Sequence, residues 1–252
     1  MKITVLGSGS AVLVPERQAS AYLIESRDNY YLLEAGDGVT GQLIRYNLEL
    51  PKINSVFISH THADHAAGII MLIQTMQQIK RTLPLEIYIP DSLLPGFESI
   101  LPYFQIYKEK LSFDLNFKGI TPQTLFKRND FQIQAVANDH LQGNQTYASQ
   151  RGLRVSSFSF LIREKTKQVI FTSDINDFDH LKSYTDQIDL LISECTHVLL
   201  PDIKTFAQSQ DIKKVLLSHI PPEIHEKQLT SENLSSPKVH ISIAQDGQEI
   251  EV

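Results

Sequence analysis

The sequence predicts an α/β protein in which two similar layers pack against each other. Runs of β-forming residues alternate with stretches whose apolar residues recur at helical spacing. Several of the β-type runs end at a residue that can bind a metal ion. The two halves of the chain also share one style, strands followed by helices, which suits two layers packed together.

Length and composition narrow the classes of protein that need to be considered. The 252 residues are expected to form a single domain, 1–252, and 42% hydrophobic residues suffice for a sizeable core. The formal net charge of −6 argues against broad attraction to nucleic acid or acidic membranes. Met1–Gly7 is a short apolar run that predicts a strand and not a signal peptide, and no apolar run is long enough to span a membrane. We therefore expect a cytoplasmic protein.

The first half of the chain is predicted to start with a strand, a hairpin and a helix. The predicted strands cover residues 3–6, 21–25, 30–33, 53–58 and 85–89, with a hairpin turn at 26–29. The predicted helices cover residues 39–48, 66–81 and 91–102. Gly7-Ser8-Gly9-Ser10 could cradle a phosphate, but a tight turn is the better interpretation because a full phosphate-binding signature is missing.

The second half is predicted to alternate strands with shorter helices. Residues 103–127 give no clear pattern, and 141–154 are predicted as a polar loop. The predicted strands cover residues 131–137, 155–162, 168–172, 188–192, 213–217 and 239–243. The predicted helices cover residues 176–184 and 203–210, with a further polar helical stretch after Pro222.

The densest chemical signal is the segment His60-Thr61-His62-Ala63-Asp64-His65. Imidazole and carboxylate together suit zinc and other borderline divalent metals. Alternate side chains of an extended segment point opposite ways, so the four groups cannot all bind one ion. We expect His60 and His62 to face one ion, while Asp64 and His65, on the turn that follows, face a second.

Three later residues resemble this cluster in one respect, because each of them also follows a run of β-forming residues. They are His140, Asp174 and His219. In open α/β sheets the ligand crevice lies beyond the carboxyl ends of the strands, so residues far apart in sequence can converge there. His180, His225 and His240 lack this context and are interpreted as surface or structural groups, whereas His197 follows a buried strand closely enough to reach the rim of the cleft.

The order of these motifs resembles that of the metallo-β-lactamase superfamily, in the branch that includes ribonuclease Z and cyclic phosphodiesterases. The resemblance covers nearly the whole chain. The matching residues are Gly7-Ser8-Gly9-Ser10, the turn Leu32–Gly38, the segment His60–Gly68, His140, Ser173-Asp174 and Ser218-His219.

The resemblance implies a four-layer αββα sandwich, with two mixed β-sheets flanked by helices, and a site for two divalent metal ions. Zinc would be the expected metal, although manganese or iron would also suit these ligands. By matching position, the first metal would be held by His60, His62 and His140. The second would be held by Asp64, His65 and His219, and Asp174 would bridge the two.

The chain departs from the pattern of this branch in three places. Glu34 stands where the turn usually carries an aspartate, the His-Ser/Thr motif of ribonuclease Z is missing, and there is no long basic arm of the kind that grips transfer RNA. Together with the acidic charge, these departures argue against structured tRNA as a partner. A bridging aspartate in place of a cysteine favours the phosphodiesterase side of the superfamily.

These observations predict a hydrolase that acts on a small or cyclic phosphodiester. Asp64 would bind metal and orient the attacking water, and His197 or Glu194 would supply or relay a proton to the leaving group. Glu34 and Asp37 could orient the metal-binding histidines, although both also suit a turn.

Other assignments stay open at this stage. Tyr147, Arg151 and Arg154 could bind a phosphate or a base, but a solvated loop is the better interpretation for each of them. Cys195, the only cysteine, is interpreted as a buried hydrophobe and not as a nucleophile. Hydrolysis of a lactone or thioester, a metal-binding sensor without turnover, and a homodimer all remain as alternatives.

Overall fold

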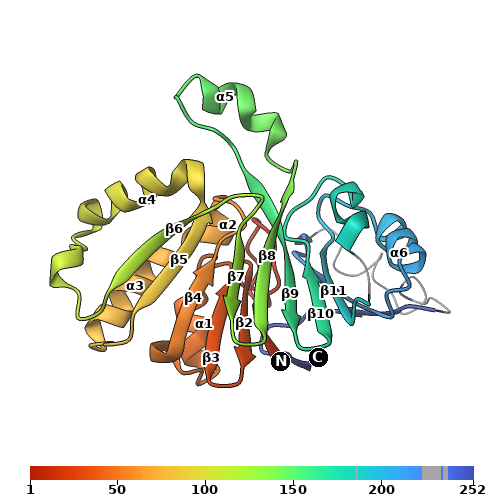
Figure 1. The fold of residues 1–252 in the computed structure, drawn as a ribbon, viewed down its shortest axis with the longest axis horizontal. Coiled ribbons are helices and arrows are strands. Elements are labelled where there is room, and N and C mark those ends of the chain that lie inside the picture. The colour runs from red at the N-terminus through yellow and green to blue at the C-terminus, as the bar shows by residue number, and fades with distance from the viewer. Residues whose placement is uncertain (185–186, 223–233, 235–237) are drawn as a thin grey trace.

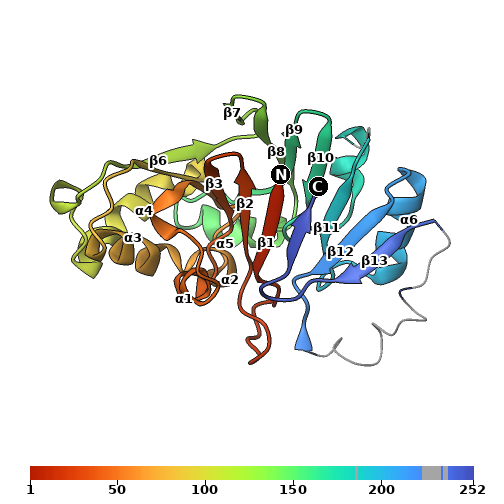
Figure 2. The same ribbon diagram turned by 90° about the horizontal axis from the view of Figure 1, so that it is seen from below.

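The protein consists of two seven-stranded β-sheets that pack face to face, with helices on the outer side of each sheet (Figures 1 and 2). The computed structural model describes residues 1–184, 187–222, 234 and 238–252. This arrangement confirms the predicted αββα sandwich.

The first sheet is built mainly from the N-terminal half. Its strand order is β14-β1-β2-β3-β4-β5-β6, with antiparallel pairing from β14 to β3 and parallel pairing from β3 to β6. The bounds are β1 (Lys2–Gly7), β2 (Ala21–Ser26), β3 (Asn29–Leu33), β4 (Ile53–Phe57), β5 (Leu85–Pro90), β6 (Leu115–Ile120) and β14 (Glu249–Glu251).

The second sheet follows the same plan. Its order is β13-β12-β11-β10-β9-β8-β7, with antiparallel pairing from β7 to β10 and parallel pairing from β10 to β13. Both sheets therefore change from antiparallel to parallel pairing part of the way across. The bounds are β7 (Leu125–Arg128), β8 (Phe131–Asn138), β9 (Ser157–Glu164), β10 (Lys167–Phe171), β11 (Leu190–Glu194), β12 (Lys214–Ser218) and β13 (His240–Ile243).

Helices cover the outer faces of the sheets, apart from α5, which stands clear beyond the ends of β8 and β9 (Figure 1). The α-helices are α1 (Val39–Arg45), α2 (Ala63–Ala66), α3 (Ile69–Gln78), α4 (Leu94–Ile100), α5 (Gln145–Ser149) and α6 (Leu200–Ser209). The 3₁₀ helices are η1 (Leu50–Lys52), η2 (Asp91–Leu93), η3 (Leu101–Phe104), η4 (Lys108–Lys110), η5 (Gln142–Asn144) and η6 (Asp179–Tyr184). Among the described residues, no helix is long and apolar enough to cross a membrane.

Three layers of apolar side chains hold the sandwich together. Between the sheets lie aromatic rings, such as Tyr31 stacked on Phe131 with centroids 4.3 Å apart. On the outer side of the first sheet, α1 and α3 bury residues such as Leu43 and Leu72. On the outer side of the second sheet, α6 buries residues such as Phe206. Because both faces of each sheet are covered, the central strands are nearly continuous apolar runs.

The structure corrects several predicted boundaries. The helix predicted over 66–81 is divided into α2 and α3 at Gly68, whose N–H donates to the carbonyl of Ala35 at 2.8 Å. A Cβ at Gly68 would lie 2.3 Å from the carbonyl oxygen of Gly36, so only glycine permits this close approach. Helix α2 also begins earlier than predicted, at Ala63, so Asp64 and His65 lie on a short helix and not on a turn.

Other differences concern segments of mixed or polar sequence. The predicted polar loop 141–154 contains η5 and α5, and the predicted helix 176–184 is only the 3₁₀ helix η6. Strands β6 and β7 lie in the stretch that gave no clear pattern, and β14 was not predicted. The polar helical stretch predicted after Pro222 lies outside the described residues, except for Leu234 and Lys238.

Candidate metal centre

The candidate site lies where strands of both sheets end. His60 follows β4 of the first sheet, while His140, Asp174 and His219 follow β8, β10 and β12 of the second sheet. The expected convergence of these four strand ends is confirmed, since all four residues meet in one cluster with the side chains of His62, Asp64 and His65.

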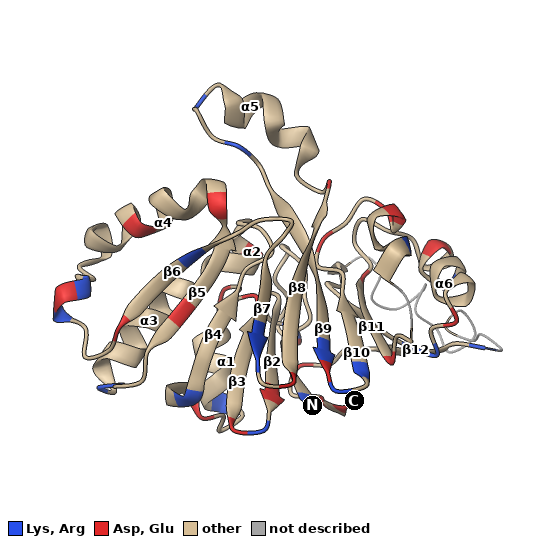
Figure 3. Cartoon of the chain, in the orientation of Figure 1, with Lys and Arg blue, Asp and Glu red and all other residues tan. Residues whose placement is uncertain are grey.

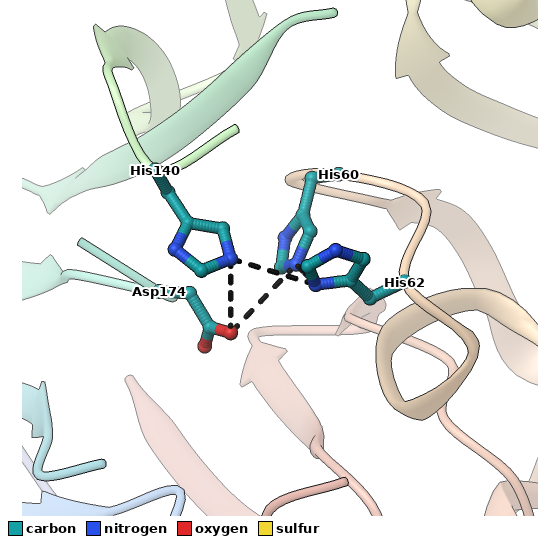
Figure 4. A group of neighbouring side chains, drawn as sticks. All are labelled: His60, His62, His140 and Asp174. Atoms are coloured by element: carbon teal, nitrogen blue, oxygen red, sulfur yellow. Dashed lines mark hydrogen bonds and ion pairs between the residues drawn. The ribbon is translucent and has the colours of Figure 1, made fainter. Parts of the chain in front are cut away.

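One half of the cluster gathers three histidines around a carboxylate oxygen (Figure 4). His62 Nδ1 lies 3.0 Å from His60 Nε2 and 3.4 Å from His140 Nε2. The Oδ2 atom of Asp174 lies 3.7 Å from His60 Nε2 and 3.5 Å from His140 Nε2. One potential ligand atom from each of these four residues lies within 4.8 Å of the others.

The other half contains Asp64, His65 and His219. Asp64 Oδ2 lies 3.0 Å from His219 Nε2 and 3.6 Å from His65 Nε2. The second oxygen of Asp174, Oδ1, lies 3.3 Å from His65 Nε2 and 3.5 Å from His219 Nε2. The two oxygens of Asp174 thus face different halves of the cluster.

The donor set suits a divalent metal. Imidazole nitrogens and carboxylate oxygens are the ligands that zinc and similar ions take, and both halves offer at least three of them. Asp174 Oδ1 is buried and accepts no hydrogen bond, which is unusual for a carboxylate oxygen in a protein interior. The cluster could therefore hold metal.

Burial prepares most of the histidines to bind as neutral rings. Loss of hydration lowers the pKa of His60 well below its usual value, lowers the pKa of His62, and lowers that of His140 to about 4. A neutral imidazole has a free lone pair, which a metal ligand requires. These three side chains are consequently unprotonated at neutral pH.

At the centre of the cluster, attraction between opposite charges shifts pKa values in the direction opposite to burial. Burial by itself would lower the pKa of His65, but the nearby carboxylates of Asp174 and Glu34 outweigh it and raise this pKa well above the usual value. Burial would likewise raise the pKa of Asp174, but His65 and His219 hold it well below the usual value. Asp174 is therefore ionised, and it attracts positive charge into the cluster.

Glu34 connects the two halves from behind. Its side chain is fully buried, and its Oε2 accepts the backbone N–H of Ser59 at 3.1 Å. Its Oε1 accepts the hydroxyl of Ser173 at 3.1 Å and lies 3.6 Å from His65 Nδ1. The Ser59 hydroxyl in turn lies 2.9 Å from His60 Nδ1. Glu34 thereby fixes groups that flank ligands in both halves.

Glu194 organises the other side of the site. Its buried carboxylate accepts the backbone N–H groups of Thr196 and His197 at 2.7 and 2.8 Å, and its Oε1 lies 3.2 Å from His197 Nδ1. The hydrogen bond with Glu194 raises the pKa of His197. His197 Nδ1 also lies 3.9 Å from Asp174 Oδ2, so the structure places His197 beside the cluster.

Three residues of the site have a left-handed backbone although none is glycine. The φ angles are 59° for Glu34, 51° for Ser173 and 49° for His219. Such conformations are uncommon for residues with a Cβ, and they concentrate at functional sites. Each lies just after a strand, β3, β10 or β12.

The structure separates the remaining predicted residues from this site. Asp37 is exposed, so its proposed role in orienting histidines is not supported, unlike that of Glu34. Tyr147 is 65% exposed on α5, and the Arg151 side chain donates to its backbone carbonyl. Arg154 pairs with Asp91 at 3.8 Å. A solvated loop is the better interpretation for these three.

The Gly7–Ser10 turn does not offer an open phosphate cradle. A carboxylate of the chain itself, that of Asp246, accepts the Ser8 N–H and hydroxyl at 3.0 and 2.8 Å and the Gln18 N–H at 2.7 Å. The interpretation as a tight turn is therefore the better one, and the turn anchors the C-terminal segment.

The other singled-out residues have structural roles or lie away from the site. Burial raises the pKa of Cys195 to about 12, as expected for a buried apolar side chain and not for a nucleophile. His180 is held against the hydroxyl of Ser159 at 2.9 Å, and His240 is exposed on β13. His225 lies outside the described residues.

Sequence reasoning missed the polar residues that support the ligands. Ser59 and Ser173 bond to each other at 2.6 Å, and the Thr196 hydroxyl lies 3.0 Å from His219 Nδ1. Such partners fix the ring orientation of metal-binding histidines. A signal was present, because Ser59 and Ser173 each directly precede a predicted ligand.

The chain has the metallo-β-lactamase fold, as comparison with solved structures shows. The structure of the metallo-β-lactamase fold protein YhfI from Bacillus subtilis superposes with a TM-score of 0.79 and 22% identity, covering 99% of this chain and 98% of that one. The short form of human tRNase Z superposes with a TM-score of 0.77 and 22% identity, over 100% and 99% of the two chains.

The chain belongs to the family described as Anti-Pycsar protein Apyc1, whose model matches residues 1–233. A curated relative, the ribonuclease Z of Treponema pallidum, is 31% identical over 155 residues, which are 61% of this chain and 49% of the relative. The chain thus spans about half the length of the curated relatives that it matches.

Proposed function

We propose that the protein is a binuclear metal-dependent phosphodiesterase that acts on a small or cyclic phosphodiester, and that 1–252 is one metallo-hydrolase domain. The observation that carries this proposal is the placement of Asp174. Its two oxygens face two separate groups of potential ligands, at 3.3–3.7 Å. A carboxylate in that position suits a bridge between two cations.

The ligand assignment follows the two halves of the cluster. His60, His62 and His140 would hold one ion, Asp64, His65 and His219 the other, and Asp174 would contact both. Zinc fits this nitrogen-rich set best, and manganese or iron would also be accepted. When bound, two such ions acidify water and offset the negative charge of a phosphoryl group.

The side chains of the protein supply positioning and proton transfer. Asp64 would orient the attacking water, because its carboxylate lies within the second group of ligands, 3.0 Å from His219 Nε2. His197 gives a proton to the leaving alkoxide, since the contact with Glu194 raises the pKa of His197 and keeps its ring protonated at higher pH. Glu194 also holds the backbone of His197 in place.

The charge distribution supports a small substrate in preference to structured tRNA. Lys and Arg are interspersed with Asp and Glu along the described chain (Figure 3), and the formal net charge is −6. Binding to a folded polyanion depends on contacts from many cations to phosphates. A single phosphodiester needs only the local positive charge of the metal centre.

Turnover assays on the metal-loaded protein test the proposal. Bis-p-nitrophenyl phosphate and a cyclic phosphodiester such as a 3′,5′-cyclic nucleotide should be hydrolysed, and a panel of lactones and thioesters should be hydrolysed much more slowly. Preferred turnover of the carboxylic esters would overturn the phosphodiesterase assignment. No turnover of any ester by fully metallated protein would instead favour a metal-binding sensor.

A further inference from the structure

Two buried serines lie behind the candidate metal centre and join residues of both sheets. Ser59 follows β4 of the first sheet, and Ser173 follows β10 of the second sheet. Their hydroxyl oxygens lie 2.6 Å apart, and Ser59 Oγ also lies 2.9 Å from His60 Nδ1. Ser173 Oγ lies 3.1 Å from Glu34 Oε1. The four side chains form one row of hydrogen bonds that ends at a carboxylate and at an imidazole ring.

This row of hydrogen bonds has one consistent direction. A carboxylate oxygen only accepts, so Ser173 donates its single hydroxyl hydrogen to Glu34. Ser173 therefore accepts the hydroxyl hydrogen of Ser59. Because Ser59 has no second hydrogen on its hydroxyl, it accepts from the ring of His60. The hydrogen of the neutral His60 ring consequently lies on Nδ1, and Nε2 keeps its lone pair.

The lone pair of Nε2 lies on the side of the ring that faces the cluster. His60 Nε2 is 3.0 Å from His62 Nδ1 and 3.7 Å from Asp174 Oδ2. All four residues of the row are buried, so solvent does not compete for their hydrogen bonds. The row therefore determines which nitrogen of His60 is available to a metal ion.

The backbone of Ser173 indicates that its side chain has a function. Its φ angle of 51° lies in the left-handed region, which favours glycine. Glycine would fit this conformation better, but it would carry no hydroxyl for Ser59 and Glu34. A residue with a Cβ in such a conformation is a reason to look for a function of its side chain.

We propose that Ser59 and Ser173 are positioning residues that select the tautomer of His60, so that its Nε2 atom is free to bind the first metal ion. The inference rests on the proposed function, because it assumes that His60 binds metal. A metal-binding histidine commonly donates its other N–H to a polar partner, which fixes the tautomer and the ring orientation. Here that partner is Ser59, and Ser173 sets the direction in which Ser59 donates.

The direction of the row predicts a specific order of effects. Ser173→Gly removes the acceptor of the Ser59 hydroxyl, whose other hydrogen-bond partner is His60 Nδ1. Donation from Ser59 to Nδ1 would place the ring hydrogen on Nε2 and block metal binding there. Ser59→Ala removes the hydroxyl altogether, so the ring loses an acceptor but meets no competing donor. Ser173→Gly should therefore be the more harmful change, and Ser59→Ala should rescue it in the double variant.

Zinc affinity, measured by competition with a chelator, tests this order. Ser173→Gly should lower the affinity about 10–100-fold, and Ser59→Ala should lower it less. The double variant should have the affinity of Ser59→Ala alone, so the two losses should not add. NMR of metal-free protein with nitrogen-15-labelled histidine gives a second readout. One ring should change from the Nδ1–H to the Nε2–H form in Ser173→Gly, and this change should be absent from the double variant.

Asn129→Gly is the matched control for the backbone change. Asn129 is exposed, has a φ of 54° and precedes β8, whereas His140 follows the other end of that strand. Glycine relieves the same conformation there as at Ser173, but away from the centre. Asn129→Gly should leave zinc affinity unchanged, and circular dichroism checks that each variant is folded. If Ser173→Gly did not fold, Ser173→Ala, which keeps the Cβ, would take its place in the comparison.

The outcomes separate this proposal from the function on which it rests. Unchanged zinc affinity in Ser173→Gly would overturn tautomer selection and leave the metal centre intact. The same conclusion would follow if the two losses added in the double variant, or if no histidine ring changed its tautomer. Failure of the unmodified protein to bind zinc would overturn both the tautomer selection and the metal centre.

Discussion

The two sheets contribute to the candidate centre in different ways. The first sheet supplies four of the seven potential ligands from one short segment, His60–His65, after β4. The second sheet supplies His140, Asp174 and His219, one from each of three strand ends. The ligands from the first sheet are close together in the sequence. Those from the second sheet come together only because the carboxyl ends of β8, β10 and β12 lie at the same edge of that sheet.

Both halves of the cluster depend on the packing of the two sheets. Each half takes at least one residue from each sheet, so neither half can form on one sheet alone. Asp174 faces both halves, and Glu34 of the first sheet bonds to Ser173 beside it. The centre therefore forms only when the two sheets are packed against each other.

The largest effect is expected at the residue shared by both halves. Asp174→Ala should lower kcat/KM by well over about 100-fold, the upper range for groups that only support metal ligands. Asp211→Ala, at an exposed aspartate, is the matched control. Steady-state kinetics with bis-p-nitrophenyl phosphate measures this. Activity of Asp174→Ala near that of the unmodified protein would refute a bridging role.

Equivalent losses are expected from one ligand of each half. His140→Ala removes a residue delivered by the second sheet, and His65→Ala removes one from the local segment. Each should reduce bound metal, measured by elemental analysis after dialysis, and each should lower turnover strongly, because the two ions act together. His240→Ala, at an exposed residue of β13, should change neither quantity. If only His65→Ala mattered, the second sheet would not take part.

A smaller effect is expected behind the ligands. Glu34→Gln keeps the shape of the side chain but removes its charge, which lies 3.6 Å from His65 Nδ1. Metal affinity or activity should fall about 10–100-fold. Competition with a chelator gives the affinity, and circular dichroism controls for folding. Unchanged affinity would show that the buried carboxylate serves the fold and not the centre.

The effect at His197 should depend on the leaving group. His197→Ala should slow hydrolysis of an ester with an alkoxide leaving group far more than that of bis-p-nitrophenyl phosphate, whose p-nitrophenolate leaves without a proton. Because the pKa of His197 is raised, the alkoxide reaction should lose rate only as pH rises through that pKa. Equal slowing of both esters at all pH values would contradict proton donation.

The same contrast between the sheets explains what the sequence could predict. The segment His60–His65 is recognisable because its ligands are adjacent, and the strand ends at His140, Asp174 and His219 became convincing only together. The role of Glu34 cannot be predicted from sequence, because a carboxylate in a Gly-rich turn looks the same whether it faces solvent, as Asp37 does, or is buried. The support from Ser59, Ser173 and Thr196 depends on contacts between separate strand ends, which spacing cannot reveal.

The elements that escaped prediction also depend on distant contacts. The break at Gly68 arises because the chain there approaches Gly36, more than thirty residues earlier. Strand β14 is only three residues long and is stabilised by pairing with β1 at the other end of the chain. Short segments of this kind lack enough periodicity to be recognised alone.

The central claim is that Asp174 lies between two metal ions. Crystals of the protein loaded with zinc, measured at the zinc absorption edge, test it directly through the anomalous difference map. The account predicts two peaks, one among His60, His62 and His140 and one among Asp64, His65 and His219, with an oxygen of Asp174 directed at each. A single peak, or two peaks away from Asp174, would contradict it.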